Sequence, residues 1–206
     1  NVVVSDADGT YACDEFTKGT QHSNSVHRLN RSTGGTKSIT ITFTGAPFGA
    51  SMVAIEVSSR GALYKDRGRW AENGSTSAPS VGPTPSTSAN SELIIASVCC
   101  ANNPTSIAVA TTSPAWTQAI EVIGGVPNVS AEVDYKLITA AAAITGSWTL
   151  GGGVTCDSVI VTYAESALVP AVIPLVGGGT PTTPPVACNP ESTTSNGGHG
   201  HAGCST

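Results

Sequence analysis

The end of the chain carries the residues best spaced to bind a metal ion. In GGHGHAGC, His199 and His201 lie two positions apart, which places both side chains on one face of an extended segment, and Cys204 follows closely. Two imidazoles and a thiolate could supply three ligands to Zn²⁺ or Cu²⁺. The surrounding glycines offer neither preorganisation nor outer-shell partners, so we expect no metal site and no cofactor.

The acidic stretch DADGTYACDE (6–15) resembles a calcium-binding loop only at its start. An EF-hand loop that opens at Asp6 needs a glycine at its sixth position and a bidentate glutamate at its twelfth. Those positions hold Tyr11 and Thr17. We therefore predict a plain Asp-Gly turn between two strands.

Residues that could act as nucleophiles or acids lack the context that catalysis requires. The sequence holds no GxSxG motif, and its cysteines fall on predicted strands or in the tail rather than at a helix start. Four carboxylates mostly take outward strand positions, where they either solubilise the surface or pair across strands as a glycosidase dyad would. Nothing in the sequence selects the dyad, so we expect no enzyme. These carboxylates are Glu56, Glu121, Glu132 and Asp134.

The six cysteines predict disulfide bonds. None forms a CxxC pair, and an even number in a chain rich in Ser and Thr fits an extracellular or virion setting. The pairing stays open, and Cys99 and Cys156 have the alternative of being small buried residues on strands. Two cysteines lie in the tail, where a covalent link to each other or to another subunit is the useful role. The candidates are Cys13, Cys99, Cys100, Cys156, Cys188 and Cys204.

Three N-x-S/T sequons are candidates for glycosylation. Each falls in a predicted loop or at a strand edge, as acceptor asparagines do, and they matter in a source that glycosylates. The acceptors are Asn30, Asn73 and Asn128.

Composition excludes several classes of partner. Only 11% of the 206 residues are charged and the formal net charge is −5, so no basic patch is available to neutralise nucleic-acid phosphates. The densest basic stretch, YKDRGRW (64–70), is predicted to be a solvated loop. No apolar run approaches the ~20 residues that span a bilayer, so we expect no membrane span.

Alternation of apolar and polar residues predicts a chain of strands. In TKSITITFTG (36–45), Ile39, Ile41 and Phe43 face one way and hydroxylated residues the other. In VSAEVDYKLIT (129–139), we expect Val129, Ala131, Val133, Tyr135 and Leu137 to point inward, opposite Ser130, Glu132, Asp134 and Lys136. The remaining predicted strands are 51–59, 91–99, 115–124 and 156–165.

The segments between the strands are predicted to be turns and loops. Residues 73–90 form a long surface loop or an extended edge segment, because proline and β-breaking residues recur there. The alanines at 140–143 could make one helical turn. We therefore predict an all-β protein, an antiparallel β-sandwich or jelly roll.

The domain is expected to span 1–167, followed by an extended, Pro/Gly-rich C-terminal arm over 168–206. Such an arm gains order when something binds it, which makes it a candidate for assembly with other subunits. Gly177–Gly179 would serve as its hinge. The apolar contact residues of the arm are Val169, Val172, Ile173, Leu175 and Val176.

The order of features "SITITFTG…EVSS…SELIIASV…W…AEVDYKLITAAAAITGSWTL…DSVIVTYAE" resembles a known kind of module. It is similar to the Ser/Thr/Gly-rich β-sandwich domains of phage structural proteins and of bacterial secreted or surface proteins. The resemblance covers roughly residues 2–165 and implies display, adhesion or assembly, with no catalytic set to carry over.

In modules of this kind, the segment that corresponds to VVVSDADGTY of this sequence normally follows an earlier strand of the GNLLVV type. This sequence begins without it, so we expect an open sheet edge that pairs with a strand from a neighbouring subunit. PAVIPLV (170–176) is the candidate donor, although Pro170 and Pro174 restrict its pairing.

These features predict a structural subunit of a repetitive assembly, located in a virion or outside the cell. A capsid-decorating or tail component comes first, with other copies of the chain or neighbouring structural subunits as partners. The alternatives are a subunit of a bacterial extracellular fibre, or an adhesive module that binds cell-surface glycans. For glycan binding, exposed tryptophans would be the stacking platforms. We expect Trp148 in the core and Trp70 exposed in its charged loop.

Overall fold

The computed structural model describes residues 2–18, 23–30, 37–44, 53–112, 114–125 and 129–166. The chain divides into two compact units, 1–169 and 170–206, and the second lies outside the described residues. The described part contains antiparallel sheets and no helix. No helix in it is long and apolar enough to cross a membrane. The strands are β1 (Val2–Asp6), β2 (Gly9–Thr10), β3 (Ala12–Lys18), β4 (Ser23–Arg28), β5 (Thr40–Phe43), β6 (Leu63–Thr76), β7 (Ser80–Val81), β8 (Glu92–Ala101), β9 (Ile107–Val109), β10 (Thr117–Gly125), β11 (Val129–Ile138), β12 (Gly146–Leu150) and β13 (Val154–Glu165).

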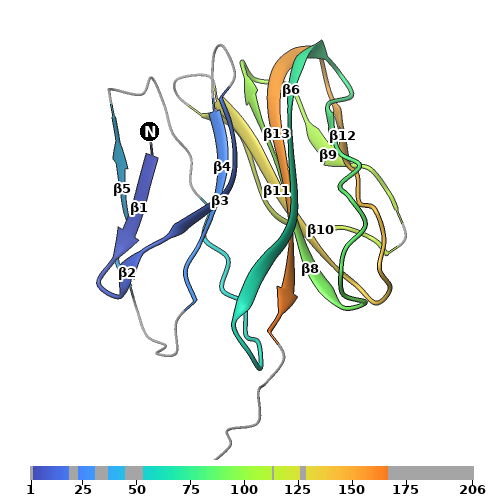
Figure 1. Ribbon diagram of the computed structural model, residues 1–206. Coiled ribbons are helices and arrows are strands. Elements are labelled where there is room, and N and C mark those ends of the chain that lie inside the picture. The colour runs from blue at the N-terminus through green and yellow to red at the C-terminus, as the bar shows by residue number, and fades with distance from the viewer. Residues whose placement is uncertain are drawn as a thin grey trace, which may run out of the picture. The chain divides into compact units, whose positions relative to one another are not determined.

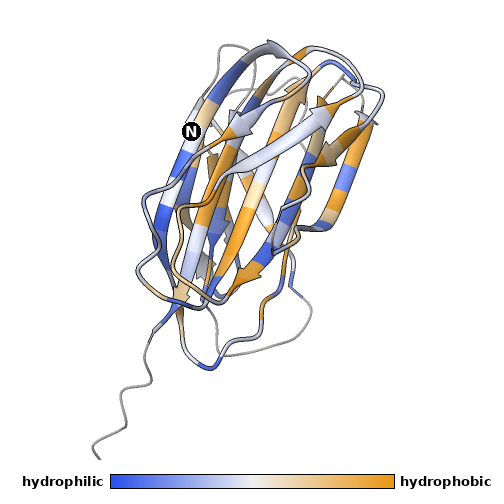
Figure 2. Ribbon diagram, turned by 90° about the vertical axis from the view of Figure 1, so that its right-hand side faces the viewer, coloured by the Kyte–Doolittle hydropathy of each residue, from blue (hydrophilic) through white to orange (hydrophobic). Residues whose placement is uncertain are grey.

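A five-stranded sheet forms the centre of the domain, in the order β10-β11-β8-β13-β6 (Figure 1). Its middle strands β8 and β13 are buried along nearly their whole length, because other strands cover both of their faces. Hydrophobic and hydrophilic residues alternate along many of the strands (Figure 2). A sheet covered on both sides needs apolar residues in both of its side-chain rows, as β8 and β13 provide.

The main core lies between this central sheet and the three-stranded sheet β7-β12-β9. Trp148 of β12, only 1% exposed, packs with Ile94 and Ala96 of β8 and with Ile160 of β13. Gly146 permits this close packing, because an added Cβ atom would lie 3.1 Å from the Trp148 ring and 3.3 Å from Ala96. The expectation that Trp148 belongs to the core is confirmed.

The hairpin β3–β4 packs on the opposite face of the central sheet, against β6, β13 and β8. A second apolar cluster forms there from Leu93, Val161 and Tyr163, with Val26 of β4 packed against it. At Gly68 of β6 a Cβ atom would collide with the Glu15 carboxylate, so glycine lets β3 approach. The result is a sandwich-like arrangement with cover on both faces. The finer prediction of jelly-roll connectivity stays a prediction.

A small sheet, β2-β1-β5, holds the N-terminal strands. The expected Asp-Gly turn is present, since Asp6 pairs with Gly9 and the backbone N–H of Asp8 donates to Asp6 Oδ1 at 2.8 Å. Gly9 has a φ of 146°, which glycine adopts without strain. On β5 the predicted alternation is confirmed, because Ile41 and Phe43 are half-buried while Thr40 and Thr42 are exposed.

Three local predictions are wrong. Residues 53–59 form no strand, and Ile55 and Val57 stay 37% and 40% exposed because no neighbouring strand covers them. The stretch 64–70 is not a solvated loop but part of β6, where its charged residues find partners such as Glu15 for Lys65. The alanines at 140–143 form no helical turn.

The segment 73–90 contains the ends of two strands and an extended edge, which was one of its two predicted forms. Its first residues belong to β6 and residues 80–81 form β7. Further along, Thr84 and Thr87 exchange hydrogen bonds with Ile144 and Ala142, at 2.9 to 3.1 Å. This pairing keeps the alanine segment extended.

The inward row predicted for β11 is also wrong. The residues that face the main core are Ser130, Glu132, Asp134 and Lys136 together with Ile138, whereas Leu137 of the other row is 65% exposed. The side-chain period of two leaves only two choices. Pairing with β8 decides between them, because it aligns Leu137 with Leu93 on the face opposite the main core.

Candidate interaction surface

The hairpin β3–β4 is held on the central sheet by a polar network. Asp14 accepts hydrogen bonds from Arg28 Nε at 2.9 Å and from the Tyr163 hydroxyl at 2.9 Å. Burial and the Asp14 carboxylate raise the pKa of Tyr163 well above its usual range. Asn24 donates to Ser97 and to the carbonyl oxygen of Asp157. These contacts fix the hairpin over β6, β13 and β8.

Beyond β8 the same face of the sheet continues over β11 and β10 as an apolar surface that water reaches. Register places Ile120 opposite Val133 and Val122 opposite Ala131, and the row on β11 continues through Tyr135 to Leu137. Leu137 is 65% exposed and Ile120 is 40% exposed, while Val122, Val133 and Tyr135 are half-buried. We call Ile120, Val122, Val133, Tyr135 and Leu137 the β10–β11 apolar face.

The two edge strands of the central sheet differ in how they are protected. β6, with the sequence LYKDRGRWAENGST, contains many charged residues. Charges on an edge strand discourage pairing with another chain. β10, with the sequence TQAIEVIGG, has Glu121 as its one charged residue. The Glu121 carboxylate accepts a hydrogen bond from the backbone N–H of Ile107 at 3.1 Å, so its charge is engaged with β9. Edge strand β10 therefore carries far fewer charges than β6, and its one charged residue also contacts β9.

No known protein supplies a function for this surface. No family model matches the chain, and no curated protein or solved structure matches it either. The resemblance to phage and bacterial sandwich modules accordingly stays a prediction. What the chain does has to be argued from its own residues.

The predicted outward position of two carboxylates is wrong. Glu132 and Asp134 are fully buried in the main core, and Asp134 accepts a hydrogen bond from Trp148 Nε1 at 2.8 Å. Burial, and then the neighbouring Asp134, raise the pKa of Glu132 to about 8. Burial also raises the pKa of Asp134. The pair is enclosed in the core rather than displayed.

Among the described cysteines, Cys100 and Cys156 form a disulfide that joins β8 to β13 at directly paired positions, with Cα atoms 4.0 Å apart. Cys156 is therefore bonded rather than simply buried. Cys13 and Cys99 keep their thiols, Cys13 on the surface and Cys99 half-buried. Burial, followed by the Asp157 carboxylate, raises the pKa of Cys99 to about 12. Cys188 and Cys204 lie outside the described residues.

The predicted glycosylation sites are placed differently from one another. The Asn30 amide is exposed and bonds both backbone groups of Leu63, at 2.7 and 3.2 Å. Asn73 lies within β6, where its amide donates to Ser158 Oγ and accepts from the N–H of Ser80. Asn128 lies outside the described residues. Glycosylation at all three stays a prediction.

The remaining candidate residues are distributed as follows. Within the described ranges no group of three or more His, Cys, Asp or Glu side chains is arranged to hold a metal ion. Trp70 is 55% exposed, as expected, although it stands on β6 rather than in a loop. The metal candidates His199, His201 and Cys204, and the arm residues Val169, Val172, Ile173, Leu175 and Val176, lie outside the described residues.

The sequence missed the most accessible residues of this surface, Ile120 and Leu137. Leu137 belongs to the row of β11 that we expected to point inward, whereas for the strand predicted over 115–124, which contains Ile120, no inward row was assigned. A signal was present in the opposite row of β11, where Ile138 continues the line of Ser130, Glu132, Asp134 and Lys136. One apolar residue at the end of a polar row is weak evidence that the row is buried. Pairing with neighbouring strands decides which row faces the main core.

Proposed function

We propose that this chain is a non-enzymatic structural subunit that associates with copies of itself in a repetitive extracellular or virion assembly, built on a jelly-roll-like sandwich. The observation that carries the proposal is the β10–β11 apolar face, which includes the edge strand β10 with its single charged residue. A capsid-decorating or tail protein and a subunit of a bacterial fibre are both assemblies of this kind.

The exposed side chains supply a driving force for association. Full burial of a side chain such as Leu or Ile is worth about 1.5–3 kcal/mol. Leu137 is 65% exposed and Ile120 is 40% exposed. Covering them therefore contributes about 1–2 kcal/mol for Leu137 and about 0.6–1.2 kcal/mol for Ile120. Stable interfaces bury about 800 Å² per partner, so the face and edge pairing through β10 must act together.

A second copy is the partner that fits this surface best. An antiparallel β10–β10 pair would continue the sheet across the interface and place the two apolar faces side by side. The edge of β10 offers its backbone groups to such a pair with a single charged residue, Glu121, on the strand. The core disulfide between Cys100 and Cys156 supports the predicted oxidising location. On its sequence alone, we propose the apolar arm 169–176 as a further assembly element.

The test is the oligomeric state of the full chain, measured by sedimentation velocity and native mass spectrometry over a range of concentrations. We expect concentration-dependent oligomers that Leu137→Lys and Ile120→Lys shift to monomers. Phe16→Lys is the matched control, because Phe16 is 59% exposed on β3, which packs against β6 and β13 rather than β10 and β11. A wild type that stays monomeric at high micromolar concentration contradicts the proposal, as does a control variant that dissociates equally.

A second candidate function, binding of cell-surface glycans, is favoured by Trp70. Its ring is 55% exposed and it lies opposite Val159 in the β6–β13 register. An exposed indole can stack on a sugar ring. The same preparations can be tested for glycan binding. If the monomer binds glycans and the Trp70→Ala variant does not, glycan binding is supported instead of self-assembly.

A further inference from the structure

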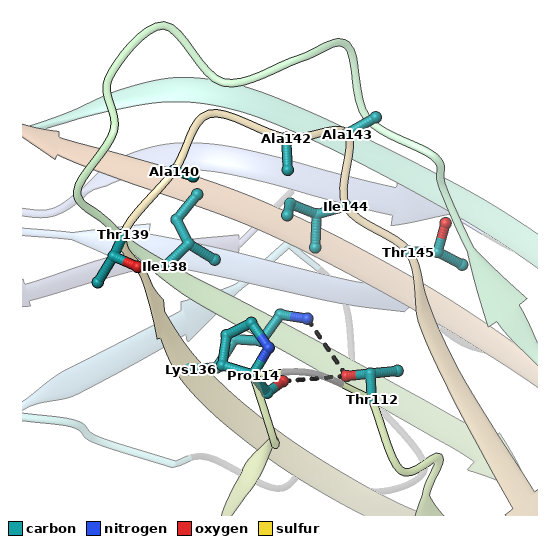
Figure 3. A pocket seen from close by; sticks show the side chains of 10 residues that line it. All are labelled: Thr112, Pro114, Lys136, Ile138, Thr139, Ala140, Ala142, Ala143, Ile144 and Thr145. Atoms are coloured by element: carbon teal, nitrogen blue, oxygen red, sulfur yellow. Dashed lines mark hydrogen bonds between the residues drawn. The ribbon is translucent and has the colours of Figure 1, made fainter.

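An open pocket of about 410 Å³ lies at the end of β11 (Figure 3). Its lining comes from β11, from the segment 139–145 that leads to β12, and from residues 112 and 114 before β10. The volume falls at the small end of the ~300–1,000 Å³ range of small-molecule sites. The pocket therefore has room for a ligand of a few heavy atoms.

The pocket combines a cation with apolar walls. Lys136 is the one charged residue in its lining, and the residue is only 6% exposed. Pro114, Ile138 and Ile144, with the alanines of 140–143, make the apolar part, and Figure 3 shows Ala142 pointing into the space. An ammonium beside aliphatic walls suits a ligand that is anionic at one end and apolar at the other.

The Lys136 ammonium has unused hydrogen-bonding capacity. Its Nζ lies 4.3 Å from the centre of the Trp116 ring and donates to Thr112 Oγ1 at 3.4 Å, which is a long hydrogen bond. Thr112 in turn donates to the Pro114 carbonyl oxygen at 3.1 Å (Figure 3). An ammonium carries three donors. Among the described residues no carboxylate pairs with Lys136.

A second donor nearby lacks an acceptor altogether. The indole N–H of Trp116, whose ring stacks against the Lys136 ammonium, is buried and has no hydrogen-bond partner among the described residues. A buried polar group without a partner is costly to the folded protein. Of these two adjacent donor groups, Lys136 lines the pocket, so its ammonium is the group that can receive acceptor oxygens there.

We propose that this pocket binds a small organic carboxylate, with its oxygens on the Lys136 ammonium and its short apolar body against Ile138, Ile144 and Ala142. A hydrogen bond to a charged partner is stronger than one between neutral groups, so the carboxylate replaces a weak hydroxyl contact with a strong one. The net charge of −5 gives no long-range attraction for anions, so recognition depends on the pocket itself.

This inference is independent of the proposed assembly. Lys136 belongs to the row of β11 that faces the main core, and Tyr135 and Leu137 belong to the opposite row. A ligand in the pocket and a partner on the β10–β11 apolar face would therefore act on different sides of the same strand.

The experiment titrates the full chain with sodium butyrate while ¹H–¹⁵N NMR follows the Trp116 indole N–H and the Thr112 amide. We expect saturable shifts at both signals, and at least about tenfold weaker binding of butyramide, which has the same shape without the charge. Lys136→Met keeps the aliphatic stem over Trp116 and is expected to weaken butyrate binding at least about tenfold. Lys37→Met removes a lysine charge elsewhere and should bind butyrate as the wild type does.

Two results would overturn the proposal. One is equal binding of butyrate and butyramide, which uses the unaltered protein and stays decisive even if Lys136→Met fails to fold. The other is equal loss of butyrate binding in Lys136→Met and Lys37→Met, which would mean that the anion responds to overall charge rather than to this pocket.

Discussion

Replacing Glu132 with glutamine should stabilise the protein at neutral and alkaline pH and leave it nearly unchanged in acid. Glu132 is fully buried beside Asp134, and its pKa rises from 4.5 to about 8. Folding therefore forces this carboxyl group to keep a proton that the unfolded chain releases. Glutamine keeps the size of the side chain and cannot ionise.

The sign of the pH dependence follows from the raised pKa. Below about pH 4.5 both states hold the proton and Glu132 costs nothing. Between pH 4.5 and 8 only the folded state keeps it, so Glu132 lowers the free energy of unfolding as pH rises, by at most ~1.4 kcal/mol per pH unit. The difference between the two pKa values sets a ceiling of about 5 kcal/mol above pH 8.

The assay is urea unfolding followed by tryptophan fluorescence, at one-unit steps from pH 4 to pH 9, for wild type and Glu132→Gln. The advantage of the variant should grow through this window and level off near pH 8. Glu56→Gln is the control, because Glu56 lies on an exposed segment outside the strands and reports the loss of a solvated carboxylate. A stability difference that stays constant from pH 4 to pH 9 would refute the argument that Glu132 is held protonated.

Two further predictions concern the cysteines. The double variant Cys100→Ala/Cys156→Ala should lower the free energy of unfolding in urea by about 4 kcal/mol, because the disulfide closes a loop with a sequence separation of 56 in the unfolded chain. A loss below ~1 kcal/mol contradicts this prediction. Cys13→Ala serves as the control. Iodoacetamide applied to the native protein should label Cys13 faster than Cys99, because Cys13 is exposed whereas the Cys99 thiol is half-buried with its pKa raised to about 12 by burial and then by Asp157. Peptide mapping by mass spectrometry measures both rates, and equal labelling would show that Cys99 is accessible.

Several elements were predictable because their signal is local. The bounds of β8, β10, β11 and β13 lie within two residues of the predicted 91–99, 115–124, 129–139 and 156–165, since each segment contains recurring Val and Ile and is bounded by turn residues. β6 was missed, because LYKDRGRW is rich in charges that usually mark a loop. Its polar residues are satisfied by segments far away in the chain, such as Ser88, which donates to Asp66, and no local pattern announces such partners.

The interaction surface was predictable only in part. The exposed position of Trp70 and the burial of Trp148 followed from their neighbours in the sequence. The surface residues Ile120 and Leu137, and the pocket residue Lys136, were assigned to the wrong side or to none. Each depends on which row of a strand faces the main core, and a one-residue change of register exchanges the two rows.

The sequence by itself determined the class of this protein: low charge, period-two alternation and turn residues permit antiparallel sheets and little else. Tertiary structure alone decided which side of each strand became core. Pairing of β11 with β8 turned Glu132, Asp134 and Lys136 into the interior and left Leu137 in water. The physical reason is that a strand has two chemically different faces, and only its neighbours determine which of them is covered.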